Sequence, residues 1–215
     1  MMTHTLHRSG GKKSLEGDYV FLAMASREYN LNGAAQKLKE IAKIFAKYNP
    51  VNMGDMSSGQ PVTMARGASP EKIINEISDR SIVHAVYTDK ETVKKVLKEL
   101  KEADIGMSVV VSGIFDEVFC ACKEVSISGP FSVDLSLGIM GKTQLLPKEE
   151  ILDITTMCGH GLVSRHLVAH LVEKIKKGEI TVDEAAKELA KQCVCGVFNP
   201  ARATKLLREI LNKEK

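Results

Sequence analysis

Residues 81–111 decide the fold, and they read SIVHAVYTDKETVKKVLKELKEADIGMSVVV. Residues 81–87 are rich in branched apolar side chains and predict a strand. Residues 88–91 (Thr-Asp-Lys-Glu) form a capping-box pattern that predicts a helix to about residue 103. Residues 107–111 are a near-continuous apolar run, typical of a strand covered on both faces. This order of elements predicts a right-handed βαβ unit whose two strands are parallel.

Similar patterns extend on both sides of this unit. An apolar run predicts a strand at residues 19–25, and strict alternation of apolar and polar residues predicts another at 131–139. Asn32 is a suitable cap for a helix at residues 33–48. Ser69 followed by Pro70 predicts the start of a further short helix.

From Pro147 onward the chain is predicted to be helical, with helices at 148–157, 161–177, 181–192 and from Asn199-Pro200 onward. The fold class is therefore α/β: a small, mostly parallel or mixed sheet with a βαβ core, followed by a helical C-terminal subdomain.

Three parts are expected along the chain. Residues 1–18 are a flexible N-terminal segment, residues 19–146 the α/β core, and residues 147–215 a helical, cysteine-bearing subdomain packed on that core. His4 and His7 lie in the first part, from which they could close over a site when a ligand binds.

The composition indicates one apolar core and an ordinary polar surface, with 44% apolar and 27% charged residues and a net charge of +3. Lys and Glu alternate along the predicted helices, which argues against a nucleic-acid partner. No apolar run approaches the roughly 20 residues of a membrane span, so no membrane partner is expected. An odd number of cysteines without a secretory signal favours a reducing compartment, so we expect a cytoplasmic protein.

Three of the five cysteines lie in two glycine-containing motifs, Met157-Cys158-Gly159-His160-Gly161 and Cys193-Val194-Cys195-Gly196. The helix at 161–177 carries the chain away by about 25 Å, and the helix at 181–192 returns it by about 17 Å. Two or three extended residues cover the remaining distance of about 8 Å. We therefore expect the three sulfurs to meet, with backbone N–H groups at the glycines stabilising the thiolates.

The favoured cofactor is a [4Fe–4S] cluster on Cys158, Cys193 and Cys195, since Cys-X-Cys differs from the Cys-X2-Cys knuckle of structural zinc sites. The preferred candidate for the fourth ligand is either His160 or an exogenous ligand. Cys120 and Cys122 are weaker candidates, because residues two apart on a helix point in different directions. A zinc ion on the same residues is the alternative, and reactive thiols or plain packing of buried cysteines also remain open.

Two loops are candidates for binding a small anionic metabolite. Residues 136–143 resemble a P-loop in which Ser replaces the first Gly, although Pro147 follows too soon for the helix that a P-loop requires. The residues that would contact the anion there are Gly138, Gly141, Lys142 and Thr143. Ser112 and Gly113 lie between a buried strand and a helix, where open α/β sheets bind ligands.

Together these patterns favour an iron–sulfur protein that binds a small anionic metabolite and acts by Lewis-acid or redox chemistry. The alternative is a non-catalytic ligand-binding or accessory protein with a structural zinc site or plain buried cysteines. A P-loop phosphotransferase is a third hypothesis. The sequence leaves open whether the protein is an enzyme and whether it forms a homo-oligomer or a larger complex.

Overall fold

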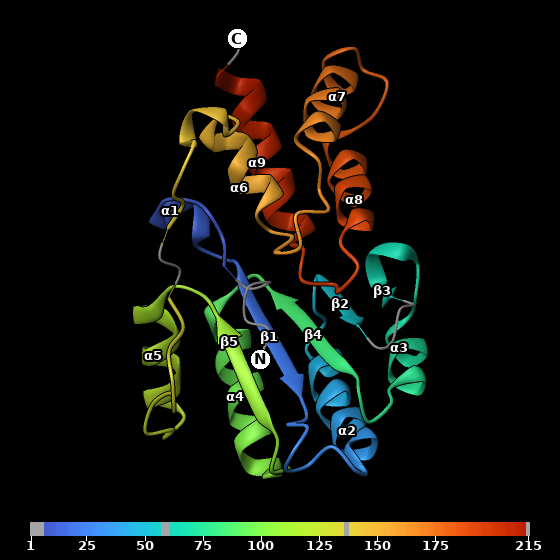
Figure 1. Ribbon diagram of the computed structural model, residues 1–215, viewed down its shortest axis with the longest axis vertical. Helices are drawn as coiled ribbons and strands as arrows, with labels where there is room; N and C mark the ends of the chain where they lie inside the picture. Colours follow the sequence, from blue (N-terminus) through green and yellow to red (C-terminus); the bar gives the residue numbers. More distant parts are fainter. Residues whose placement is uncertain (1–6, 57–60, 136–137, 214–215) are drawn as a thin grey trace.

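The computed structural model describes residues 7–56, 61–135 and 138–213. Its centre is a five-stranded sheet with the strand order β3-β2-β4-β1-β5 (Figure 1). The strands are β1 (Tyr19–Met24), β2 (Asn52–Asp55), β3 (Val62–Thr63), β4 (Ile82–Tyr87) and β5 (Ser108–Ser112). The protein is therefore α/β, as predicted, although the direction of its strands differs from the prediction.

Each neighbouring pair of strands in this sheet is antiparallel. Strands β4 and β5 do run in the same direction, as their connection through α4 (Lys90–Ala103) requires, but β1 lies between them. The predicted parallel pairing is therefore wrong. The apolar strand β1 is almost entirely buried. Strands β4 and β5 cover its two edges, and helices pack on both faces of the sheet. The resulting connectivity is the split βαβ, or ferredoxin-like, arrangement.

One face of the sheet packs on helices α2 (Ala34–Lys47), α3 (Pro70–Glu76), α4 and α5 (Phe115–Glu124). Phe21 is at the middle of this core, with ring centroids 5.6 Å from Phe45 and 5.5 Å from Tyr87. Such aromatic pairs each contribute about 0.5–1.5 kcal/mol beyond the area they bury. This core covers one face of the sheet.

The other face carries Val20, Leu22 and Val86 and packs on the C-terminal part of the chain. That part consists of α6 (Glu149–Thr155), α7 (Arg165–Lys176), α8 (Val182–Gln192) and α9 (Pro200–Lys213). Figure 1 shows these helices beyond one end of the sheet, with the loop between α8 and α9 reaching down to β2. None of the described helices is long and apolar enough to span a bilayer.

Side-chain caps fix the starts of several helices. Thr181 and Glu184 form the predicted capping box of α8. Asp89, rather than the predicted Thr88, caps α4 by accepting a hydrogen bond from Thr92 N at 2.8 Å. Ser164 caps α7, so this helix begins at Arg165 and not at residue 161. The shorter α7 spans about 18 Å and α8 about 16 Å, so the outward and return paths nearly cancel.

One further expectation differs from the structure. The described part of the predicted strand at 131–139 forms no strand, and Phe131 and Leu135 are exposed to 106% and 68%. Alternation alone does not make a strand, because the backbone also needs a neighbouring edge to take up its hydrogen bonds. Residues 136 and 137 lie outside the described part of the chain.

The described part of the N-terminal segment, residues 7–18, contacts helix α6. Ser9 N donates to Thr156 Oγ1 at 3.0 Å, and Ser14 Oγ donates to Asp153 at 2.9 Å. Ser14 belongs to a short helix, α1 (Lys12–Leu15), which precedes β1.

Candidate functional site

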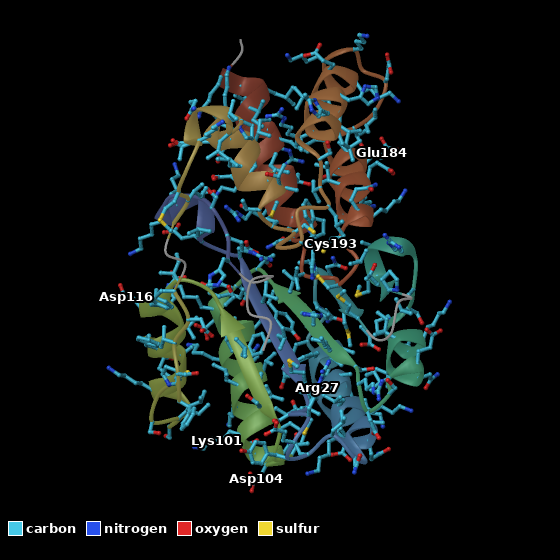
Figure 2. All side chains as sticks on the ribbon, in the orientation of Figure 1. Arg27, Lys101, Asp104, Asp116, Glu184 and Cys193 are labelled. Carbon is cyan, nitrogen blue, oxygen red and sulfur yellow. The ribbon has the colours of Figure 1, made fainter. Side chains whose placement is uncertain are left out.

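The structure brings the three C-terminal cysteines together where the sheet meets the helices. Cys158 lies in the turn after α6, Cys193 is the C-cap of α8, and Cys195 lies in the loop that leads to α9. All three are at most 1% exposed. Cys193 is labelled in Figure 2, between the end of the sheet and the helical part.

The sulfurs form a chain of contacts. Cys193 Sγ is 3.7 Å from Cys195 Sγ, and Cys195 Sγ is 3.7 Å from His160 Nδ1. The Cys158 thiol donates a hydrogen bond to Cys193 on its other side. The four residues named from the sequence are thus neighbours in space, across two loops that the α7–α8 hairpin separates.

Two glycines let the cysteine loop lie flat against the sheet. A Cβ atom on Gly54 of β2 would be 2.8 Å from the Cys195 carbonyl oxygen. A Cβ atom on Gly196 would be 2.7 Å from Gly54 N, and Gly196 has a φ of +80°, which favours glycine. Any larger side chain at either position would push the loop off the strand.

A buried polar network holds the same loop from the other side. Asp18 accepts hydrogen bonds from Arg8 at 2.7 Å and from Arg202 at 2.9 Å, and all three side chains are at most 3% exposed. Arg8 also donates to the Val197 carbonyl oxygen. Asn52 of β2 donates to the Phe198 carbonyl oxygen at 2.9 Å. These bonds fix the backbone that follows Cys195.

The three thiols shift one another's pKa values in opposite directions. The pKa of Cys193 is lowered because the Cys158 and Cys195 thiols donate hydrogen bonds to its sulfur, with further help from backbone N–H groups. The pKa values of Cys158 and Cys195 are raised, first because each donates to Cys193 and then because both are buried. Backbone N–H groups two residues further along the chain favour the thiolate at every one of the three sulfurs.

His84 was not singled out from the sequence, but it belongs to this site. It lies on β4, pairs in register with Leu22 and Gly54, and is only 2% exposed. Burial lowers its pKa to about 4, while the nearby Cys193 acts in the opposite direction. The signal in the sequence was a single histidine inside an apolar strand.

The distances can be compared with those of metal–thiolate centres. Two sulfurs bound to one zinc ion at about 2.3 Å and at tetrahedral angles lie about 3.8 Å apart, close to the 3.7 Å found here. The ligand sulfurs of a four-iron cluster stand on different irons and must be farther apart. Within the described residues, no set of three or more His, Cys, Asp or Glu side chains is arranged to hold a metal ion as it stands.

The other candidate ligands lie elsewhere. Cys122 is buried in the core on the opposite face of the sheet. Cys120 is exposed and contacts Glu124 at 3.2 Å. His166 and His170 are both exposed on α7. None of these side chains joins the group around Cys193.

The two predicted anion loops are separated in the structure. Ser112 and Gly113 line a cavity of about 690 Å³, which also reaches Arg8 and His7. The remaining predicted contacts are exposed and do not line this cavity; they are Gly138, Gly141, Lys142 and Thr143. Residues 143–145 form only a short 3₁₀ turn, so the helix that a P-loop requires is missing there. His4 lies outside the described residues.

Comparison of the chain with protein families, curated proteins and solved structures found no significant match. What can be stated is a class of site: a buried cluster of thiols and imidazoles between an antiparallel sheet and a helical hairpin.

Proposed function

We propose that the protein holds a thiolate-ligated metal centre on Cys158, Cys193 and Cys195. The observation that carries this proposal is the convergence of three buried sulfurs from two loops, each with backbone N–H groups that favour its ionised form. Soft thiolate ligands select zinc, copper(I) and iron–sulfur clusters. A purely structural role for three adjacent buried thiols would not require the polar network and the glycine contact that fix their loop.

A single zinc ion is the form that the distances favour. The Sγ–Sγ distance of 3.7 Å between Cys193 and Cys195 is that of two ligands on one tetrahedral ion. With a histidine in the fourth position, the site has the composition Cys₃His of closed structural zinc sites. The protein would then be a zinc-stabilised ligand-binding or accessory protein.

The [4Fe–4S] cluster is the second candidate. In its favour are the short Cys-X-Cys spacing, which zinc knuckles rarely use, and the cavity of about 690 Å³ that reaches Arg8, whose guanidinium contacts Val197. An iron with an open position would act as a Lewis acid on a small anionic metabolite bound near Ser112 and Gly113. For either metal, a reducing compartment such as the cytoplasm keeps the thiols available.

Elemental analysis of protein purified without air tests the proposal and separates its two forms. About one zinc per chain in a colourless protein supports the single ion, and about four irons per chain in a brown protein supports the cluster. Cys193→Ser should remove the metal, whereas Cys120→Ser, at an exposed cysteine, should retain it. Wild-type protein that contains neither metal, and that takes up neither on reconstitution, would refute the proposal.

A further inference from the structure

His84 is a buried polar side chain, and one of its two ring nitrogens is unsatisfied among the described residues. It is 2% exposed, and its Nδ1 atom has no hydrogen-bond partner within the described residues. An unsatisfied buried polar group costs about 1–3 kcal/mol, so such groups are uncommon in folded proteins. A ligand that binds to this nitrogen would remove the cost.

The position of His84 directs its imidazole toward the cysteine loop. Its side chain leaves β4 on the same face as Val86, the face that packs on the C-terminal helices. In the sheet it is paired with Gly54, whose missing side chain leaves space for the Cys195 backbone. Cys193 is close enough to act electrostatically on the imidazole, and so is His160.

We propose that His84, through Nδ1, is the fourth protein ligand of the metal centre. This inference rests on the proposed function, because it assigns a ligand to the same centre. Neutral imidazole is the form that binds metals, and Cys₃His is an established zinc ligand set. His160 then has a different role: its Nδ1 lies 3.7 Å from Cys195 Sγ and donates a hydrogen bond to that sulfur from outside the ligand set.

With this assignment the metal joins two parts of the molecule. His84 belongs to a central strand of the sheet, whereas the three cysteines belong to the loops of the helical part. Metal binding therefore stabilises the docking of the helices on the sheet, in addition to the loops themselves. A Cys₃ centre completed by His160 would lie entirely within the helical part.

Cobalt(II) substitution tests the assignment, because the d–d bands of bound cobalt, at roughly 500–800 nm, report the ligand set of a tetrahedral site. In His84→Ala the bands should lose their tetrahedral pattern, and cobalt affinity should fall by at least about 100-fold. In His160→Ala the bands should keep their pattern, with affinity about 10-fold to 100-fold weaker. His170→Ala, at an exposed position on α7, is the matched control and should change neither.

Each result leads to a decision. Unchanged bands in His84→Ala, together with altered bands in His160→Ala, would overturn the assignment and leave the metal centre intact. Failure of the wild type to bind cobalt or zinc would instead count against the proposed function itself. If His84→Ala does not fold, His84→Cys decides: a stronger sulfur-to-cobalt charge-transfer band supports ligation at this position, and an unchanged band refutes it.

Discussion

Gly54→Ala is the substitution that tests the architecture of the site most directly. Position 54 lies on β2 with its missing side chain directed at the cysteine loop, and an added Cβ atom would be 2.8 Å from the Cys195 carbonyl oxygen. The same atom would be 2.8 Å from Thr63 Cγ2 and 3.1 Å from the Cys195 carbonyl carbon. The backbone of the loop, and not only a flexible side chain, must therefore move.

The cost can be worked from these contacts. Restoring an ordinary contact requires the Cys195 carbonyl group to move by about 0.6 Å, and overpacking of this kind costs about 1–3 kcal/mol. For a chain of this size each kcal/mol lowers the melting temperature by about 2–4 °C. The displaced loop also carries Cys193 and Cys195, so both thiols should become more reactive and the metal affinity should fall.

Urea denaturation and thiol labelling measure the two effects separately. We expect a lower urea midpoint with a nearly unchanged m-value, because a loop shift of about 0.6 Å hardly alters the surface exposed on unfolding. In metal-free wild type the exposed Cys120 should react quickly and the buried cysteines slowly. Gly11→Ala is the control, since its added Cβ atom meets nothing within 4 Å. A Gly54→Ala protein with wild-type stability and protected thiols would show that the loop does not lie on β2.

Three further predictions concern other parts of the molecule. Asp18→Asn should destabilise the protein by about 3–5 kcal/mol in urea denaturation, because it leaves the buried Arg8 and Arg202 without their shared carboxylate. In metal-free protein, the free energy of unfolding should fall by up to about 3 kcal/mol between pH 6.5 and pH 4. The reason is that His84 is protonated in the unfolded chain over this range but stays neutral when it is buried. His84→Leu should remove this part of the acid sensitivity. Phe131→Ser should change the unfolding free energy by no more than about 0.5 kcal/mol, because the ring is fully exposed.

Each of these has its own control or contrary outcome. Asp183→Asn removes an exposed ion pair with Arg208 and should cost no more than about 1 kcal/mol. An acid titration of stability that is identical in wild type and His84→Leu would show that this imidazole is not buried in solution. A loss of several kcal/mol in Phe131→Ser would indicate that its ring is covered in solution, by the chain itself or by a second copy.

The local patterns of the sequence predicted most of the helices and three of the five strands, β1, β4 and β5, because caps and periodicity are short-range signals. Residues 19–25 were recognised as a strand, but its insertion between β4 and β5 depends on long-range pairing that no local pattern records. The alternation at 131–139 shows the limit of the method, since it describes a side-chain pattern without supplying a partner edge.

The site was predictable to a similar degree. The convergence of Cys158 with Cys193 and Cys195 followed from helix lengths, and it survives the shorter α7 because α7 and α8 are nearly equal in length. His84 was missed because its importance comes from its place beside a loop that follows roughly 100 residues later in the chain. Lys142 was given a role by its resemblance to a motif, although the structure leaves it exposed in a loop.

The central place of β1 has a consequence for the order in which the chain assembles. This strand emerges first during synthesis, yet its two neighbours, β4 and β5, follow only after residue 81 and residue 107. The sheet can form only after segments far apart in the sequence have come together, and folding is slow when contacts are of this long-range kind. The cysteine loops emerge later still, so the metal proposed for them would bind as a late, post-translational step on a sheet that has already formed.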